Sequence, residues 1–140
     1  MERFQDYVAA NRERFLDELK VWCAQPSIAT QGVGLKEMAS LIEKRLKGLG
    51  ATVRRIAIDR SPPTLVAELG HGKKTLLVYN HYDVQPPDPL NEWKSPPFEP
   101  AIRDGQFFAR GVADDKGDLL CRLQAIEAYE KTVGPLPFHI

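Results

Sequence analysis

The stretch that decides the fold covers residues 75–86, where TLLVYN is followed directly by HYDVQP. Residues 75–80 are nearly all apolar, which is typical of a strand covered on both faces. Open α/β sheets bind ligands just beyond the carboxyl ends of their strands. We therefore expect residues 75–80 to form a central strand and residues 81–86 to begin a functional site.

Helical periodicity and turn residues on either side complete an α/β pattern. Apolar residues recur at helical spacing over residues 1–22, with a break near Asn11, and over residues 35–49. The other expected elements are strands over 52–58, 64–69 and 136–140, a hairpin over 98–109 that turns at Asp104-Gly105, and a helix that begins after Asp114-Asp115. The expected fold is a three-layer α/β/α domain with a central, mostly parallel sheet, incomplete at the C-terminus.

The composition favours an ordinary globular domain and excludes several classes of partner. The 19 basic residues balance 19 acidic ones, so we expect no nucleic acid and no membrane as partner. No apolar run approaches the roughly 20 residues that span a bilayer. The N-terminus lacks the apolar core of a signal peptide, which favours a cytoplasmic location. Cys23 and Cys121 are expected to be reduced thiols, although the sequence leaves a disulfide open.

His81 and Asp83 are the first candidate site residues. In an extended chain, side chains two residues apart point to the same side, so both can face one site. A metal-bound imidazole needs its second nitrogen anchored, and a carboxylate such as Asp83 can provide the anchor. The alternative is a solvated loop histidine beside an unrelated acid.

Asp114 and Asp115 form the second candidate, at the junction of a strand end and a helix start. One aspartate there can simply be the N-cap of the helix. Two adjacent carboxylates repel each other unless a cation compensates them, and one carboxylate can bridge two metal ions. Gly111 and Gly117 would let the backbone turn tightly around such a site.

These two motifs together resemble a family of zinc metallopeptidases and deacylases, which includes carnosinase, cytosolic dipeptidases, acetylornithine deacetylase and succinyl-diaminopimelate desuccinylase. The family carries His-x-Asp-Val-x-Pro and then Gly-Arg-Gly-x-x-Asp-x-Lys-Gly, which residues 81–86 and 109–117 match except for Ala109 in place of the first glycine. The resemblance covers most of the chain from about Leu35 onward, and residues 79–117 are most similar to the dipeptidase-like members.

The resemblance implies that His81 binds one metal ion, that Asp114 bridges two, and that Asp83 is the catalytic-site acid that orients His81. It implies Asp115 to be structural. The implied cofactor is a pair of Zn²⁺ ions, with Mn²⁺ or Co²⁺ as alternatives, and the implied substrate is a dipeptide or small peptide. An N-acyl amino acid is the alternative substrate. Members of the family often dimerise, so the resemblance implies a homodimer for the full-length protein.

The general-base glutamate and the remaining metal ligands of the family match no residue of this chain. We therefore interpret residues 1–140 as the N-terminal portion of a zinc-hydrolase catalytic domain, with the lid and dimerisation domain and the C-terminal half absent. Catalytic zinc sites take at least three protein ligands, so this chain alone is expected to be inactive. A hypothesis of another class is a non-catalytic fragment or binding remnant.

Several other residues have simpler interpretations. His71 is expected to be an exposed turn residue and His139 a packing residue, while Trp22 and Trp93 are expected to pack in the core or a loop. The sequence leaves open whether Arg110 pairs with an acid near the site or anchors the turn. Residues 32–34 lack the lysine and hydroxyl residue of a phosphate-binding loop.

Overall fold

The structure is a computed structural model that describes residues 2–59 and 61–140. Its helices are α1 (Glu2–Ala10), α2 (Arg12–Ala24), α3 (Leu35–Gly48) and α4 (Lys116–Thr132), with short 3₁₀ turns at Ala29–Gln31 and Leu90–Glu92. Its strands are β1 (Thr52–Ile56), β2 (Thr64–Glu68), β3 (Ala101–Arg103) and β4 (Gln106–Phe108). The helices agree with the sequence periodicity, including the break at Asn11, where the helical conformation is interrupted.

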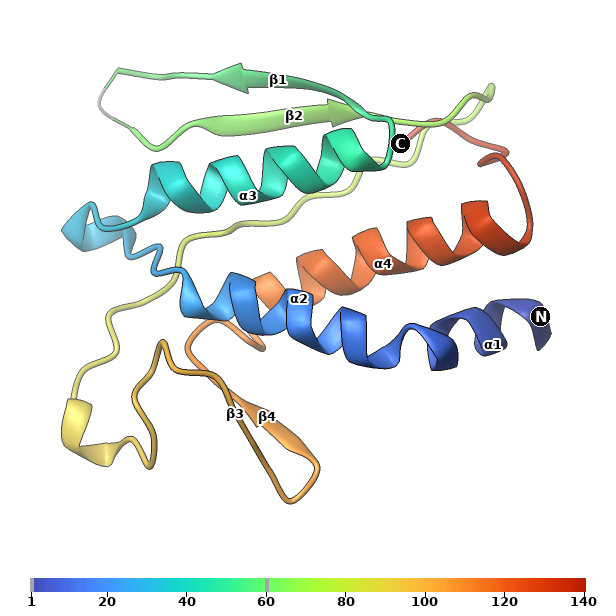
Figure 1. The fold of residues 1–140 in the computed structure, drawn as a ribbon. Coiled ribbons are helices and arrows are strands. Elements are labelled where there is room, and N and C mark those ends of the chain that lie inside the picture. Colours follow the sequence, from blue (N-terminus) through green and yellow to red (C-terminus); the bar gives the residue numbers. More distant parts are fainter. Residues whose placement is uncertain (1, 60) are drawn as a thin grey trace.

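Both strand pairs are antiparallel hairpins (Figure 1). In the first, Thr52 lies opposite Glu68 and Ile56 opposite Thr64, and the pair contacts α3. The second is the expected hairpin, and its turn residues Asp104 and Gly105 have φ angles of 50° and 74°. Asp and Gly tolerate this left-handed conformation, which the tight two-residue turns of hairpins require.

The α/β class is confirmed, but the central strand expected over residues 75–80 is not formed as a ladder. Within the described residues, parallel pairing is limited to the isolated bridges Ile28–Val84 and Thr75–His139. The expected terminal strand at 136–140 is likewise reduced to backbone bonds at His139 and Ile140. A strand is defined by continuous pairing with a neighbour, and these bridges do not continue along residues 77–79.

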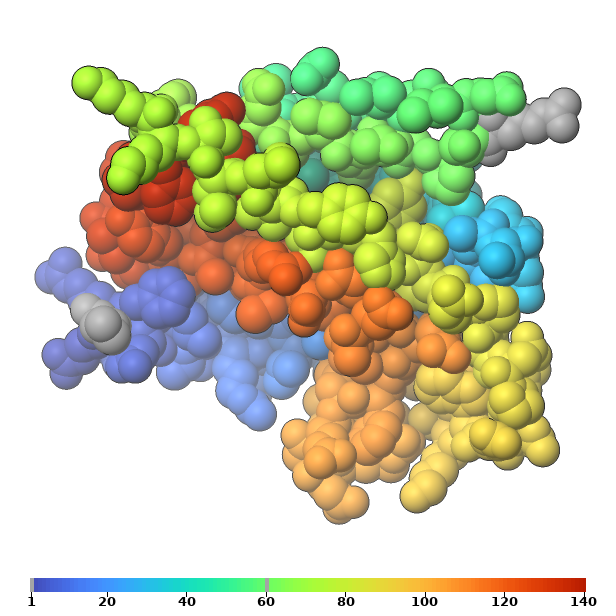
Figure 2. Space-filling view, turned by 180° about the vertical axis from the view of Figure 1, so that it is seen from behind, coloured from blue at the N-terminus to red at the C-terminus, as the bar shows by residue number. Residues whose placement is uncertain are grey.

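The expectation that residues 75–80 are covered on both faces is therefore wrong. The side chains of Leu77 and Tyr79 are 90% and 83% exposed. This stretch, yellow-green in Figure 2, runs along the surface of the molecule. Its apolar residues have the composition of a buried strand without the neighbours that would bury it.

The helices enclose the core. Its central cluster consists of buried residues from α2, α3 and α4, namely Trp22, Met38, Ile42, Leu120 and Leu123. Leu119 and Ile126 of α4 also pack against this cluster, so α4 turns an apolar face toward the core. Each fully buried leucine of this kind stabilises the fold by about 1.5–3 kcal/mol.

Both cysteines are free, with Cys23 buried and Cys121 exposed, so the disulfide alternative does not apply. Their positions are compatible with the expected reduced thiols. Among the helices of residues 2–59 and 61–140, none is both long enough and apolar enough to cross a bilayer.

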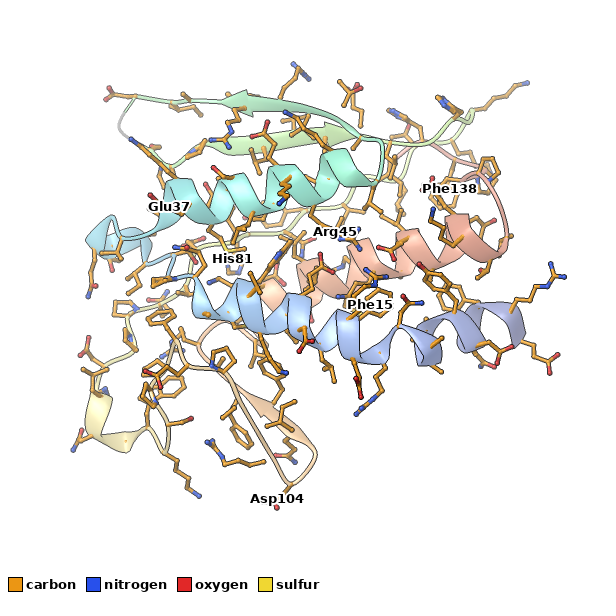
Figure 3. All side chains as sticks on the ribbon, in the orientation of Figure 1. Phe15, Glu37, Arg45, His81, Asp104 and Phe138 are labelled. Atoms are coloured by element: carbon orange, nitrogen blue, oxygen red, sulfur yellow. The ribbon has the colours of Figure 1, made fainter. Side chains whose placement is uncertain are left out.

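A polar cluster around Glu127 joins the helices beside the apolar core. The Glu127 carboxylate, in α4, pairs with the guanidinium groups of Arg14 and Arg45 and accepts a 2.8 Å hydrogen bond from the hydroxyl of Tyr7. Arg45 extends from α3 into the space between the helices (Figure 3), where its Nε lies 2.8 Å from Glu18. One carboxylate thus ties residues of α1, α2 and α3 to α4.

The polar cluster around Glu127 makes the stability of the fold sensitive to acid. Burial alone raises the pKa of Glu127, but the hydrogen bonds from Arg14, Tyr7 and Arg45 outweigh burial and lower its pKa. A carboxyl whose pKa is lower in the folded state stabilises the fold above its unfolded pKa. That contribution is lost as the pH falls through the folded pKa, here below about pH 4.5.

We predict that Glu127→Gln lowers the free energy of unfolding at pH 7 by about 2 kcal/mol, because charged hydrogen bonds are replaced by neutral ones. Urea denaturation between pH 3 and 7 provides the measurement. The variant should also lose less stability on acidification than the unaltered chain. Asp17→Asn is the matched control, since the exposed Asp17–Lys20 pair should contribute at most about 0.5 kcal/mol. Equal stability losses in the two variants would contradict this account.

Candidate metal centre

The first site segment, residues 81–84, is held by the turn that follows α2. The hydroxyl of Ser27, which is fully buried, donates a 2.6 Å hydrogen bond to the carbonyl of Tyr82. The amide of Val84 in turn donates to the carbonyl of Ser27 at 2.8 Å. On the other side, the Tyr82 hydroxyl donates to the carbonyl of Pro63 at 2.7 Å. The backbone on both sides of Asp83 is therefore fixed.

The second site segment, residues 111–117, approaches the first so closely that glycine is required. Gly111 has a φ of 86°, and a Cβ there would lie 2.8 Å from a methyl carbon of Val84. A Cβ on Gly117 would lie 2.0 Å from the carbonyl oxygen of Val112. The predicted tight turn is therefore confirmed: Gly111 allows the two segments to touch, and Gly117 allows the second segment to fold back on Val112.

Lys116 anchors this second segment to the same end of α2. Its side chain is fully buried, and its ammonium group donates to the carbonyls of Trp22 at 3.1 Å and Gln25 at 2.5 Å. These carbonyls are among those left unpaired at a helix C-terminus, where a cation is also favoured by the helix dipole. Burial lowers the pKa of Lys116 to about 8.

The structure brings the three predicted site residues, His81, Asp83 and Asp114, together. Nε2 of His81 lies 2.9 Å from Oδ1 of Asp114. On the opposite side of the ring, Nδ1 lies 3.1 Å from the backbone carbonyl oxygen of Asp83 and 3.3 Å from its Oδ1. Each ring nitrogen of His81 therefore faces one aspartate.

Charge around the ring favours a cation there. Partial burial by itself lowers the pKa of His81, but the backbone hydrogen bond with Asp83 and the charges of Asp83, Asp114 and Asp115 together raise the pKa. The Asp114 side chain is 76% exposed and that of His81 is 37% exposed, so the pair opens to solvent. A group of acids that stabilises a protonated ring also attracts a metal ion.

Asp115 lies in the site but turns away from the ring. Its Oδ2 accepts hydrogen bonds from the side-chain amide of Asn80 at 2.7 Å and from the backbone amide of His81 at 3.1 Å. The peptide bond between Asp114 and Asp115 is cis. The two adjacent aspartates therefore contact different parts of the same histidine.

The residues present fit part of a metal site. Two ligands about 2.0–2.1 Å from a tetrahedral zinc ion lie roughly 3.3 Å apart, so the spacing of 2.9 Å between His81 and Asp114 needs little change. A neutral imidazole and a carboxylate are both common zinc ligands. Within residues 2–59 and 61–140, no three His, Cys, Asp or Glu side chains are grouped so as to hold a metal ion.

An apolar cavity of about 540 Å³ reaches the site from the side of the core. His81, Tyr82 and Asp83 line one part of it, and side chains of β2, α3 and α4 line the rest, including Leu65, Leu46 and Leu123. Residues of β2 and residues 78–80 both line it.

Other residues considered in the sequence have structural roles. The guanidinium of Arg110 lies 5.1 Å from the centre of the Trp93 ring and donates to the carbonyl of Pro86 at 3.2 Å, so Arg110 anchors the loop. Trp93 packs in that loop and donates to the carbonyl of Pro87, while His71 is exposed. His139 pairs through its backbone with Lys74 and Leu76.

Sequence reasoning missed Ser27, Asn80 and Lys116. Asn80 lies directly before the first motif and Lys116 lies inside the second. A polar residue at the end of each segment was therefore the available signal. Ser27 gave no signal of its own, because its contact with Tyr82 spans 55 positions of the chain.

Comparison with known proteins gives a family match and several similar proteins. Residues 77–140 match the family described as Peptidase family M20/M25/M40. The chain is 31% identical to Beta-Ala-His dipeptidase of Mus musculus over its whole length, covering 32% of that protein. It is 44% identical to succinyl-diaminopimelate desuccinylase of Azoarcus sp. over 64% of the chain and 23% of that protein.

Among solved structures, human carnosine dipeptidase 1 superposes with a TM-score of 0.90 at 31% identity, over 99% of this chain and 33% of that one. The chain thus spans about a third of the length of the dipeptidases that it matches. The matched residues include both site segments, and the superposition extends to the N-terminal helices outside the family match. Residues 77–140 therefore match Peptidase family M20/M25/M40, and the whole chain is homologous to about a third of Beta-Ala-His dipeptidase.

Proposed function

We propose that this chain contributes His81 and Asp114 to the two-zinc site of a hydrolase that cleaves dipeptides or other small peptides, in the context of a longer protein. The observation that carries the proposal is the 2.9 Å contact between Nε2 of His81 and Oδ1 of Asp114. This contact brings together a nitrogen donor and an oxygen donor from residues 33 positions apart. The Asp114 carboxylate is exposed, and its second oxygen is available to a second ion. The family match supports peptide hydrolysis in general.

In this proposal Asp83 orients the ring of His81. Its carbonyl and carboxylate oxygens both lie near Nδ1, which favours the tautomer with its proton on Nδ1. Nε2 is then left with a free electron pair directed toward Asp114. An oxygen acceptor in this position also raises the basicity of a ligating histidine.

When bound, two zinc ions would polarise the scissile carbonyl and lower the pKa of a bridging water. This chain's own contribution is to hold two donor atoms at a fixed separation on rigidly anchored segments. The third ligand of each ion and a general base are expected from elsewhere in the longer protein, so the chain alone should not turn over substrate.

A deacylase is the second candidate. The succinyl-diaminopimelate desuccinylase of Azoarcus sp. is 44% identical over the part of the chain that it matches. Removal of an N-acyl group from an amino acid breaks the same kind of amide bond as peptide hydrolysis. The same pair of metal ligands can therefore serve either substrate.

We predict that His81→Ala in the full-length protein abolishes peptide hydrolysis and lowers the bound zinc, because one ligand of the site is removed. Zinc content by elemental analysis and initial rates on a dipeptide provide the two measurements. His71→Ala is the matched control, since His71 is exposed and lies outside the site. Full activity with normal zinc content in His81→Ala would rule out the role assigned to His81. A full-length protein that holds no zinc and hydrolyses nothing would support the non-catalytic hypothesis.

We further predict that kcat/KM of the full-length protein is higher for unmodified dipeptides than for N-acetyl or N-succinyl amino acids. The alignment to the dipeptidases extends over the whole chain, whereas the alignment to the desuccinylase covers 64% of it. Rates on both classes at equal concentration, with one metal loading, give the comparison. A preference for the N-acyl compounds would transfer the assignment to the deacylase.

A further inference from the structure

The Asp115 carboxylate makes contacts that its place in the chain does not by itself explain. Asp115 is the N-cap residue of α4, a position whose side chain usually accepts a hydrogen bond from the first turn of the helix. In this structure it makes no such bond. Its Oδ2 instead accepts from Asn80 and from the backbone amide of His81, 34 positions earlier.

These contacts are shielded from water. The side chain of Asp115 is 15% exposed, against 76% for the neighbouring Asp114. Arg122, about two turns further along α4, lies 4.0 Å from Oδ1 of Asp115 and 3.8 Å from Asp118. The Asp115 carboxylate is therefore mostly buried, but its charge is balanced by two hydrogen-bond donors on one oxygen and a cation near the other.

We infer that Asp115 is a positioning residue for the metal ligands, an inference that rests on the proposed function. By holding the backbone of His81, Asp115 fixes the start of the first site segment against the residue next to Asp114. The spacing between Nε2 of His81 and Oδ1 of Asp114 then depends on the hydrogen bond from the His81 backbone amide to the Asp115 carboxylate. Asp83 and Asp114 repel each other, so without that hydrogen bond only the metal ion would hold the two site segments together.

The hydrogen-bond link can be separated from the negative charge. Asparagine at position 115 keeps an oxygen with two lone pairs and so can accept both bonds without the charge. Leucine has a similar size and accepts none. Asp118→Leu is the matched control, because Asp118 carries the same charge near the same arginine and is 62% exposed.

The test is a Zn²⁺ titration of the full-length protein and its variants, followed by competition with a chromophoric chelator. We expect Asp115→Leu to raise the Kd for Zn²⁺ by roughly 10- to 100-fold, as loss of a group that orients a ligand typically does. Asp115→Asn and Asp118→Leu should stay close to the unaltered chain. An unchanged Kd in Asp115→Leu would overturn the inference, and so would an equal loss in Asp115→Asn, which would indicate a role of charge alone.

Hydrogen exchange of the His81 amide provides a test that needs no metal and no folded leucine variant. In the unaltered chain this amide should exchange much more slowly than the amide of Leu77, whose residue is 90% exposed. Equally fast exchange of both amides would overturn the inference. If this amide is protected but the unaltered full-length protein binds no Zn²⁺, the link to Asp115 stands while the proposed function fails.

Discussion

The site depends on one feature, the turn that ends α2. The carbonyls of Trp22 and Gln25 hold the buried ammonium of Lys116, and Ser27 bonds to the backbone of Tyr82 and Val84. Both site segments are thus fastened to the last turn of α2 and the residues directly after it. Because a buried ammonium without partners would be strongly unfavourable, Lys116 specifies where α4 must begin.

From this anchor the remaining geometry follows by contact. Gly111 lets the second segment pass against Val84 of the first. Asp114, just before the start of α4, then lies beside His81. The apolar face of α4 packs on Trp22 and Met38, and Glu127 fixes its far half to the other helices through Arg14 and Arg45. The proposed metal ligands His81 and Asp114 therefore lie on backbone that is held by the core rather than on a free loop.

The sequence predicted the parts of this structure that are encoded locally. Helical periodicity located α3 and α4, Asn11 marked the break between α1 and α2, and Asp104-Gly105 specified a hairpin turn. The grouping of His81, Asp83 and Asp114 could be anticipated through the resemblance of their two motifs to the metallopeptidase family, since residues 75–80 form no continuous strand whose end would place them.

What escaped prediction depends on contacts between distant residues. The apolar residues 75–80 have the composition of a buried strand, but burial requires neighbours on both sides, and composition does not provide them. In the structure, β2 and residues 78–80 instead face each other across an apolar cavity that Ile140 also lines. The use of Lys116 as a helix anchor and of Asp115 as a link to His81 likewise requires knowing what lies opposite each side chain.

The most direct test of the account is to locate the metal itself. Crystals of the full-length protein grown with zinc can be measured on both sides of the zinc absorption edge, and the anomalous difference map marks each ion. The account predicts a peak within bonding distance of both Nε2 of His81 and an oxygen of Asp114, about 2.0–2.2 Å from each, with a second peak on the other oxygen of Asp114. Zinc bound elsewhere, with His81 and Asp114 still paired to each other, would contradict it.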